Sequence, residues 1–365
     1  MSEPIRVLQV FAALDSGGVA NFVMNTYRRI DREKIQYDFA ITSGEKSLMD
    51  DEAKALGARL FYCDTDKNLA ENIGDIIKNE GPFEAVHSHV FFYSGLVLRA
   101  AKRYGVPIRI AHAHNAHTGE SLSLPRKAYE AGMRHLINSN ATVMMGCSEK
   151  ACRYVFGDNC MSDSRAMVMP DGIDCERFAF NEEMREKVRR EYGLEDKFVV
   201  GHVGHFNPAK NHEKILSAFA ELAKRREDAA LLLVGDGELE NDVRAKVQEL
   251  GLSDKVVFAG AHKDVENMYQ AMDVFLFPSR YEGFGMAMIE AQLNGLACVA
   301  SDVVPEDTNA DSRAVYLPLD EADAVWADAI EDAPLRSSEK VENVVASFDI
   351  ENTAKNLEKI YSGNL

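Results

Sequence analysis

The segment DVFLFPSRYEGFGMAMIEA, residues 273–291, decides the fold because it holds one strand, one turn and one helix in succession. Residues 274–277 are β-branched, aromatic or aliphatic, which predicts a buried strand, and the glycine-containing turn leads into an apolar helix. Backbone N–H groups at a helix start attract anions, and glycines such as Gly283 and Gly285 let a ligand approach the backbone. The segment therefore predicts an α/β unit with an anion site before its helix.

Two glutamates flank this expected anion site, Glu282 on the turn and Glu290 about one turn inside the helix. A carboxylate repels an anion, but it accepts hydrogen bonds from hydroxyl groups. We interpret the pair as acceptors for the hydroxyls of a ribose and a hexose, with a diphosphate held between them. The alternative is a pair of ordinary glutamates on a helix surface.

The same alternation of strands and helices runs through the chain and restarts near its middle, which indicates two similar halves. A chain of 365 residues is long enough for two domains. Alternation of this kind predicts parallel sheets covered by helices on both faces. Strands are expected at residues 5–12, 37–42, 59–63, 85–90, 108–114, 142–147 and 167–169, then at 198–203, 230–234, 256–259, 274–277 and 297–300.

Five segments in this order resemble the family 4 retaining glycosyltransferases of GT-B fold, and the similarity is nearest to the capsular and exopolysaccharide biosynthesis subgroup. They are residues 17–19 (GGV), 170–174 (PDGID), 203–211 (VGHFNPAKN), 233–238 (LVGDGE) and 278–290, and the subgroup also carries a segment like AHAHN at 111–115.

This resemblance implies an α/β GT-B fold of two facing Rossmann-like doubly wound domains with a cleft between them. Residues 1–170 would form the N-terminal, acceptor-side domain, and residues 171–348 the nucleotide-sugar-binding domain. Residues 349–365 would form a C-terminal helix that returns to the first domain.

The resemblance also assigns the site residues. The catalytic set is His114, Glu282 and Lys210. Lys210 matches the phosphate-binding lysine, Glu290 the acceptor for the ribose hydroxyls, Glu282 the residue near the donor sugar, and His262 lies in the loop that binds the base. The donor-binding set is Gly17, Gly18, His205, Lys210, His262, Glu282, Gly283, Phe284, Gly285, Met286 and Glu290.

Two positions depart from the family pattern. His205 stands where the family usually has an arginine that clamps the diphosphate with the lysine, and imidazole lacks the donor fork of guanidinium. Asp171 stands where the family more often has asparagine. We expect His205 to bind phosphate as a weaker substitute.

Five histidines gather near the ends of two expected neighbouring strands: His87, His89, His112, His114 and His117. His114 best matches the family histidine that binds the donor sugar or positions the acceptor, with His112 as its competitor. Metal binding is the rival interpretation, because His-x-His on a strand directs both rings to one face. The family requires no metal, so we predict no metal or other cofactor.

Composition and charge narrow the location and the partners. The net charge is −18, and charges balance over residues 1–170, so the acidic excess lies in the second half. No apolar run spans a bilayer and the start lacks signal-peptide features, which predicts a cytoplasmic protein with reduced cysteines. Acidity disfavours nucleic acid. A locally basic stretch, residues 99–134, raises the alternative of peripheral contact with the inner face of the cell membrane.

The predicted function is transfer of a hexose from a nucleotide-sugar, by expectation a UDP-sugar, to a saccharide or lipid-linked saccharide in surface polysaccharide biosynthesis. One alternative is a nucleotide-sugar epimerase of the same fold, which would act without an acceptor. The other is a non-catalytic GT-B-like binding or assembly subunit, which would bind donor without turnover.

Overall fold

A computed structural model describes residues 3–15, 18–114, 123–282, 284–337 and 341–364. The chain forms two compact units, and each is described by itself. The first comprises Met1–Ile173 with Phe348–Leu365, and the second comprises Asp174–Ser347. The boundaries expected from the sequence, at 170/171 and 348/349, lie near these divisions.

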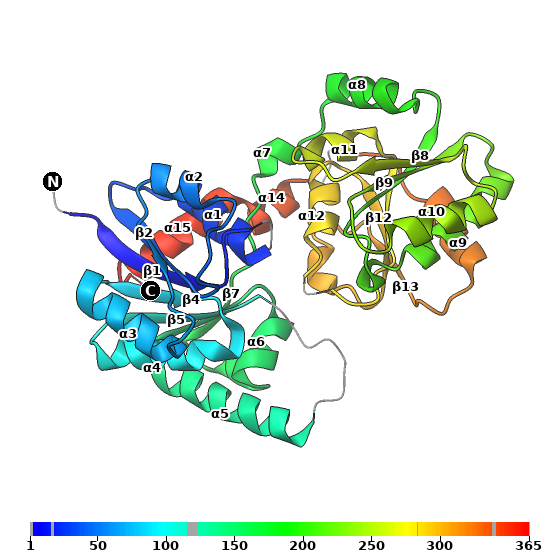
Figure 1. Cartoon of the computed structure of the whole chain (residues 1–365). Helices are drawn as coiled ribbons and strands as arrows, with labels where there is room; N and C mark the ends of the chain where they lie inside the picture. The colour runs from blue at the N-terminus through cyan, green and yellow to red at the C-terminus, as the bar shows by residue number, and fades with distance from the viewer. Residues whose placement is uncertain (1–2, 16–17, 115–122, 283, 338–340, 365) are drawn as a thin grey trace. The chain divides into compact units, whose positions relative to one another are not determined.

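The first unit is built on a seven-stranded parallel sheet with the order β3-β2-β1-β4-β5-β6-β7 (Figure 1). Every strand expected in this half is present, most within one or two residues of the expected ends. The strands are β1 (Ile5–Phe11), β2 (Ile35–Ile41), β3 (Leu60–Tyr62), β4 (Ala85–Ser88), β5 (Ile108–Ala113), β6 (Val143–Gly146) and β7 (Ala166–Val168).

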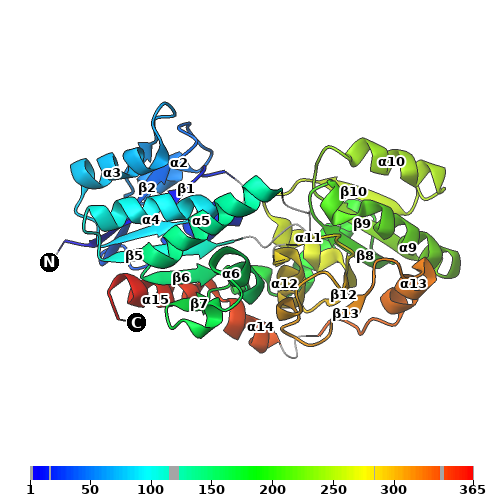
Figure 2. The ribbon, with the colours of Figure 1, turned by 90° about the horizontal axis from the view of Figure 1, so that it is seen from below.

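Helices cover this sheet, and side-chain caps define the start of some of them. The Asn68 side chain accepts a hydrogen bond from Glu71 N, and the Ser148 side chain accepts one from Ala151 N, which satisfies backbone donors that a helix start leaves free. Helices α4 and α5 lie side by side (Figure 2). The helices are α1 (Gly18–Arg29), α2 (Asp50–Ala55), α3 (Leu69–Glu80), α4 (Ser94–Arg103), α5 (Leu124–Asn140), α6 (Glu149–Phe156) and α15 (Ile350–Tyr361), with 3-10 turns η1 (Phe91–Tyr93) and η2 (Cys160–Ser162).

The C-terminal helix α15 is part of the first unit's core. It packs beside α1, and its Leu357 and Tyr361 are fully buried among apolar residues of the first sheet. The aromatic ring of Tyr361 lies edge-on to Tyr37 of β2, with ring centroids 5.8 Å apart. The last turn of the chain therefore closes the core around the first strands.

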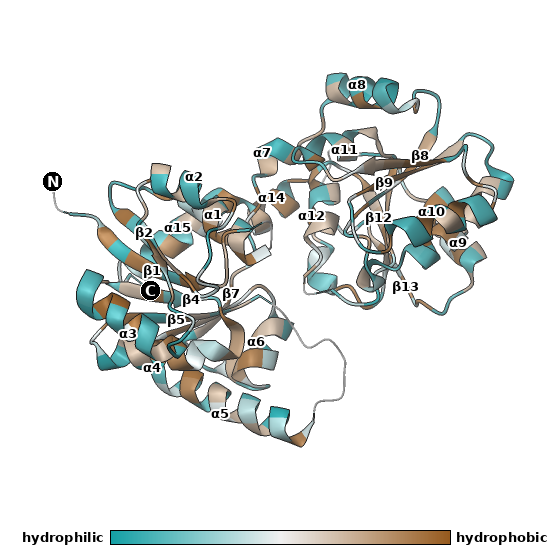
Figure 3. Cartoon of the chain, in the orientation of Figure 1, coloured by the Kyte–Doolittle hydropathy of each residue, from teal (hydrophilic) through white to brown (hydrophobic). Residues whose placement is uncertain are grey.

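The second unit repeats the design with six parallel strands in the order β10-β9-β8-β11-β12-β13. The sequence pattern did not predict strand β13, because this strand is three residues long, lies at the sheet edge and is only partly buried. Strand β9 is apolar along its length, whereas β8 carries the buried His202 among mostly apolar residues; Figure 3 colours the chain by hydropathy. The strands are β8 (Phe198–Val203), β9 (Ala229–Val234), β10 (Val256–Gly260), β11 (Val274–Phe277), β12 (Ala297–Ser301) and β13 (Val315–Leu317).

The helices of this unit include one that the apolar pattern did not reveal. In α13 (Asp323–Glu331), Trp326 is fully buried and packs in the core with residues of α9. The others are α7 (Cys175–Phe178), α8 (Glu182–Tyr192), α9 (His212–Arg225), α10 (Glu240–Glu249), α11 (Val265–Ala271), α12 (Met286–Leu293) and α14 (Val341–Phe348), with 3-10 turns η3 (Pro208–Lys210) and η4 (Glu306–Thr308).

Both sheets reverse their strand order at one place, between β1 and β4 and between β8 and β11. At such a switch point the connections leave to opposite faces, so the carboxyl ends of the two strands border a crevice where ligands bind. The switch points therefore locate the candidate sites. All six cysteines are buried thiols, as expected. None of the helices in the described part of the chain is long and apolar enough to span a bilayer.

We predict that Leu357→Ala lowers the free energy of unfolding of the first unit by about 2–5 kcal/mol, because it leaves a cavity in a closed core. Circular dichroism in urea follows both units, whereas fluorescence of Trp326, the one tryptophan of the chain, follows the second. Lys355→Ala, a substitution of an exposed residue on the same helix, serves as the control and should leave the dichroism transition unchanged. A Leu357→Ala protein with an unchanged dichroism transition would contradict this packing.

Candidate functional site

Lys210 and Glu282 meet at the switch point of the second sheet. Lys210 ends η3, which follows β8, and Glu282 follows β11. The Lys210 Nζ lies 2.6 Å from Glu282 Oε1, and the same oxygen accepts a hydrogen bond of 2.6 Å from Ser279 Oγ. The side chains are 19% and 11% exposed, and the ammonium also lies over the Phe277 ring, 4.8 Å from its centroid. Two residues 72 positions apart thus form a partly buried ion pair.

Short hydrogen bonds hold the two loops that carry this pair. The Asn207 side chain accepts from the backbone N–H groups of Ala209 and Lys210, which shapes the turn before the lysine. Asn211 has a φ of 55°, and its Nδ2 donates to Pro278 O at 3.1 Å. The Arg280 N–H donates to Ala209 O at 2.7 Å. These bonds link the loop after β8 directly to the loop after β11.

The loop after β9 packs against the loop after β8 without room for side chains. A Cβ on Gly235 would lie 2.1 Å from Gly204 O, and Gly235 has a φ of 138°. Residue 235 is therefore glycine for two reasons, close approach and backbone conformation. This contact places Asp236 beside His205, with His205 Nδ1 3.0 Å from Asp236 Oδ1 and both side chains about 60% exposed. His205 thus borders the switch point and is accessible.

Glu290 lies in α12, partly buried, and its Oε2 accepts a hydrogen bond of 2.6 Å from the Tyr269 hydroxyl. Burial raises the pKa of the Glu290 carboxyl, while the Tyr269 hydrogen bond and the Arg177 charge oppose the rise. Arg177 itself pairs with Glu266 at 2.7 Å. The two glutamates of the 278–290 segment therefore have different partners, a lysine for Glu282 and a tyrosine for Glu290.

The remaining expected donor-binding residues are distributed along the same loops. Gly285 has a φ of 97° and precedes α12, Met286 begins that helix, and Phe284 is buried. His262 follows β10, where its Nε2 lies 3.1 Å from the Tyr192 hydroxyl and 3.1 Å from Ala259 O. Gly18 begins α1 in the first unit, where an added Cβ would meet nothing. Gly17, Gly283 and His117 lie outside the described residues.

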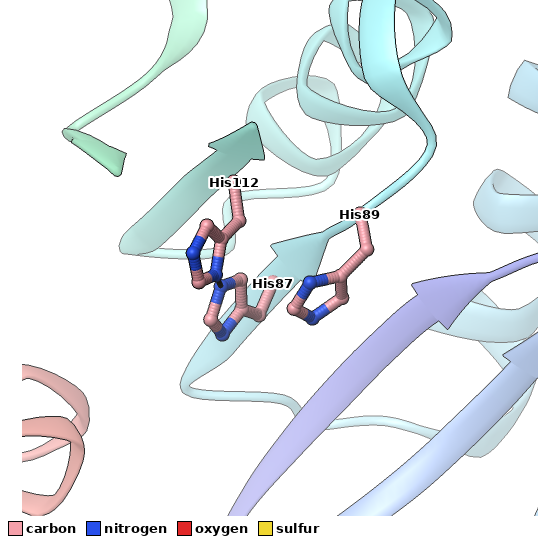
Figure 4. A group of neighbouring side chains, drawn as sticks. All are labelled: His87, His89 and His112. Atoms are coloured by element: carbon pink, nitrogen blue, oxygen red, sulfur yellow. Dashed lines mark hydrogen bonds between the residues drawn. The ribbon is translucent and has the colours of Figure 1, made fainter. Parts of the chain in front are cut away.

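Four of the five histidines gather at the first sheet. His87 lies on β4 and His89 just after it, while His112 lies on β5 and His114 just after it, so alternation directs all four rings to one face. Figure 4 shows the rings of His87, His89 and His112 together, with a hydrogen bond between His87 and His112. The expected grouping is therefore present in the structure.

Hydrogen bonds connect these rings to β1 and to the C-terminal helix. Gln9 of β1 donates through Nε2 to the Tyr361 hydroxyl at 3.1 Å, and that hydroxyl lies 2.7 Å from His87 Nδ1. Gln9 Oε1 lies 2.9 Å from His89 Nε2. Burial lowers the pKa of His87, His89 and His112 well below 6.5, and the neighbouring rings lower it further. These three imidazoles are therefore neutral at neutral pH.

Sequence reasoning missed the residues that hold the predicted ones in place. Ser279 and Tyr269 bind the two glutamates, Asn211 joins two loops, and Gln9 and Tyr361 connect the histidines. Ser279 lies three residues before Glu282 in the chain, so the sequence could have predicted their contact. Tyr269 and Tyr361 gave none, because only the packing of α11 and α15 brings them to these positions.

Two parallel sheets, each with a polar group at its switch point, define a doubly wound α/β protein with the GT-B architecture. Two family models match the chain: "Glycosyltransferase Family 4" over residues 16–177 and "Glycosyl transferases group 1" over residues 184–314. EpsF of Bacillus subtilis (strain 168), which is assigned as a glycosyltransferase, is 35% identical over 332 residues, 89% of this chain and 86% of EpsF. The chain belongs to this glycosyltransferase family and is an enzyme of that class.

Other relatives extend the likeness over nearly the full length. The capsular polysaccharide biosynthesis glycosyltransferase CapH of Staphylococcus aureus is 24% identical over 98% of both chains. Among solved structures, Anabaena HepE in complex with UDP superposes with a TM-score of 0.81 at 17% identity, covering 99% of this chain and 100% of HepE. The predicted family and fold are confirmed, and the relatives favour neither the epimerase nor the non-catalytic alternative.

We predict that Lys210→Met and Glu282→Gln each destabilise the second unit more than the double variant does. Either single change leaves a partly buried charge without its partner. Breaking a fully buried pair costs about 3–5 kcal/mol of stability, and the cost should be smaller for this pair because both side chains are partly exposed. The double-mutant cycle should give a coupling of about 0.5–3 kcal/mol. Urea unfolding followed by Trp326 fluorescence measures it, and additive effects would show that the pair contributes nothing.

Proposed function

We propose that this glycosyltransferase transfers a hexose, with retention, from a UDP-sugar to a saccharide acceptor, free or lipid-linked, in surface polysaccharide synthesis. The observation that carries the donor assignment is the group of Lys210, Glu282 and Glu290 on the loop and helix that follow β8 and β11. The UDP complex of HepE supports the choice of nucleotide, and CapH supports a polysaccharide product.

In this proposal Lys210 binds the donor diphosphate. Its ammonium already lies at the switch point, held by Glu282 and the Phe277 ring. Charge on the leaving diphosphate grows as the glycosidic bond breaks, so a cation placed there stabilises the transition state. His205, which lies beside Asp236, is a second donor to the phosphates.

The two glutamates act on the two sugars of the donor. Glu290, hydrogen-bonded by Tyr269, accepts from the ribose hydroxyls, and Glu282 contacts the transferred hexose. His262 lies in the loop that binds the base. By the family resemblance, Gly17 and Gly18 are further candidates for diphosphate binding, and His114 is the candidate that binds the sugar or positions the acceptor. Transfer proceeds without a metal cofactor, because these cations and N–H donors neutralise the diphosphate.

Glu290→Ala should weaken UDP binding about 10- to 150-fold, equivalent to the roughly 1.5–3 kcal/mol of hydrogen bonds to a charged group. Glu282→Ala should lower the rate of hexose transfer without weakening UDP binding, because Glu282 contacts the hexose and its removal leaves the Lys210 ammonium free for the diphosphate. Tyr269→Phe should weaken UDP binding less than Glu290→Ala, because the carboxylate remains. Isothermal titration with UDP measures all three, and equal affinity in wild type and Glu290→Ala would contradict the assignment.

We further propose that the start of α5 contacts anionic membranes. Leu124, Arg126 and Lys127 are exposed there, and the Leu124 side chain is 82% exposed, which pairs an apolar residue with basic ones. Arg134 is a weaker candidate, because its guanidinium donates to the carbonyls of Tyr154 and Val155. A lipid-linked acceptor would be reached from such a surface.

Sedimentation with vesicles rich in anionic lipid tests this surface. Wild type should pellet at low salt and be released as salt rises, because exposed charges are screened over about 8 Å at physiological ionic strength. Replacing both Arg126 and Lys127 by alanine should reduce pelleting, whereas replacing the exposed Lys187 and Arg190 of α8 should not. Equal pelleting of both double variants would show that the start of α5 does not bind the membrane.

A further inference from the structure

Three buried polar atoms near the end of the histidine group have no hydrogen-bond partner among the described residues: His112 Nε2, His114 Nδ1 and Asp171 Oδ1. His112 is 2% exposed, and the side chains of His114 and Asp171 are 6% and 15% exposed. A buried polar atom without a partner costs about 1–3 kcal/mol. Three such atoms, on residues whose ligand atoms lie within 4.8 Å of one another, point to a shared bound group.

The spacing of these groups matches metal ligation better than direct hydrogen bonding. His112, His114 and Asp171 each offer one ligand atom within 4.8 Å of the other two. His114 Nδ1 and Asp171 Oδ1 lie 3.4 Å apart without forming a hydrogen bond. Two ligand atoms bound tetrahedrally at about 2.1 Å from one ion lie about 3.4 Å apart. The observed separation, which also lies within ion-pair distance, fits two ligands on a shared ion.

The neighbouring trio His87, His89 and His112 is a poorer candidate, although its ligand atoms are equally close. Both ring nitrogens of His87 are engaged, by the Tyr361 hydroxyl and by His112 Nδ1. Both of His89 are engaged too, by Gln9 Oε1 and by His114 Nε2 at 2.8 Å. These two rings therefore serve as outer partners that orient the rings of His112 and His114.

One arrangement of protons leaves both facing nitrogens free to bind an ion. If His89 Nε2 donates to Gln9 Oε1, then His89 Nδ1 accepts from His114 Nε2, and the lone pair of His114 lies at Nδ1. If His112 Nδ1 donates to His87 Nε2, then the lone pair of His112 lies at Nε2. Metal-bound histidines usually donate their second N–H to such an outer partner, which fixes the ring and strengthens the ligand.

We propose that His112 Nε2, His114 Nδ1 and Asp171 Oδ1 bind one divalent transition-metal ion of the zinc class. Two imidazoles and a carboxylate suit Zn²⁺ and leave at least one coordination position open. Cys147 is left out of the ligand set, because its thiol donates to His114 O at 3.4 Å.

Isothermal titration of the full-length, chelator-treated protein with Zn²⁺ tests the site. We expect one equivalent of Zn²⁺ to bind. Asp171→Asn keeps the shape of the side chain and removes its charge, so it should weaken Zn²⁺ binding by at least about 10-fold. Loss of a residue that only hydrogen-bonds a metal ligand already has an effect of that size. His135→Ala, which removes an exposed histidine of α5, should bind as wild type does. Circular dichroism confirms that each variant is folded.

X-ray absorption at the zinc edge of the loaded wild type needs no variant. The proposal requires nitrogen and oxygen neighbours at about 2.0–2.2 Å, with imidazole scattering and no sulfur at about 2.3 Å. A sulfur neighbour, no saturable binding by wild type, or equal affinity of Asp171→Asn and wild type would overturn it.

Metal binding stands independently of the proposed function, but its consequence rests on the role proposed for His114. A bound ion occupies His114 Nδ1, so Zn²⁺ should slow hexose transfer and a chelator should restore it. Zinc binding without inhibition would count against the role of His114 in transfer and leave the metal site intact. Inhibition that persists in Asp171→Asn after its zinc affinity is lost would place the inhibitory ion elsewhere.

Discussion

The structure depends on the reversal of strand order in two parallel sheets, at β1/β4 and at β8/β11. Parallel strands require crossover connections, and those that leave a switch point to opposite faces cannot cover it. Each unit therefore has one place where loops from distant parts of the chain meet without a helix above them. Lys210 and Glu282 meet at one such place, and Gln9 and His87 pair in register at the other.

Polar groups at these places differ in how their burial is compensated. At β8/β11 a lysine is neutralised by a glutamate and supported by Ser279, so the charge pair is satisfied within the protein. A donor diphosphate that binds Lys210 would have to share the ammonium with Glu282 or displace the Glu282 carboxylate from it. At the first sheet the compensation is incomplete, because a chain of imidazoles that begins on β4 ends, on and after β5, in atoms without partners among the described residues. We propose the first group as an anion site and the second as a cation site.

The sequence proposed candidate site residues, but it did not identify the residues that position them. Glu282, Glu290 and Lys210 were identified by a resemblance carried by short motifs, and alternation along two strands brought the histidines to one face. Their assigned roles remain predictions. His205 was expected to clamp phosphate with Lys210, and in the described residues it is found beside Asp236. That neighbour comes from the loop after β9, and the close contact of Gly235 with Gly204 O decides it.

The sequence by itself determined the two-fold α/β plan, the strands with strong apolar patterns and the family, because these depend on local periodicity and on motifs within a few residues. It could not determine β13 or α13, whose own patterns are weak and whose position depends on packing at a sheet edge or around Trp326. Only the tertiary structure decided that Tyr269 holds Glu290, that Tyr361 reaches His87 and that Asp171 approaches His114. These pairs are far apart in the chain, and a hydrogen bond or shared ion depends on distances of a few ångströms that no sequence pattern encodes.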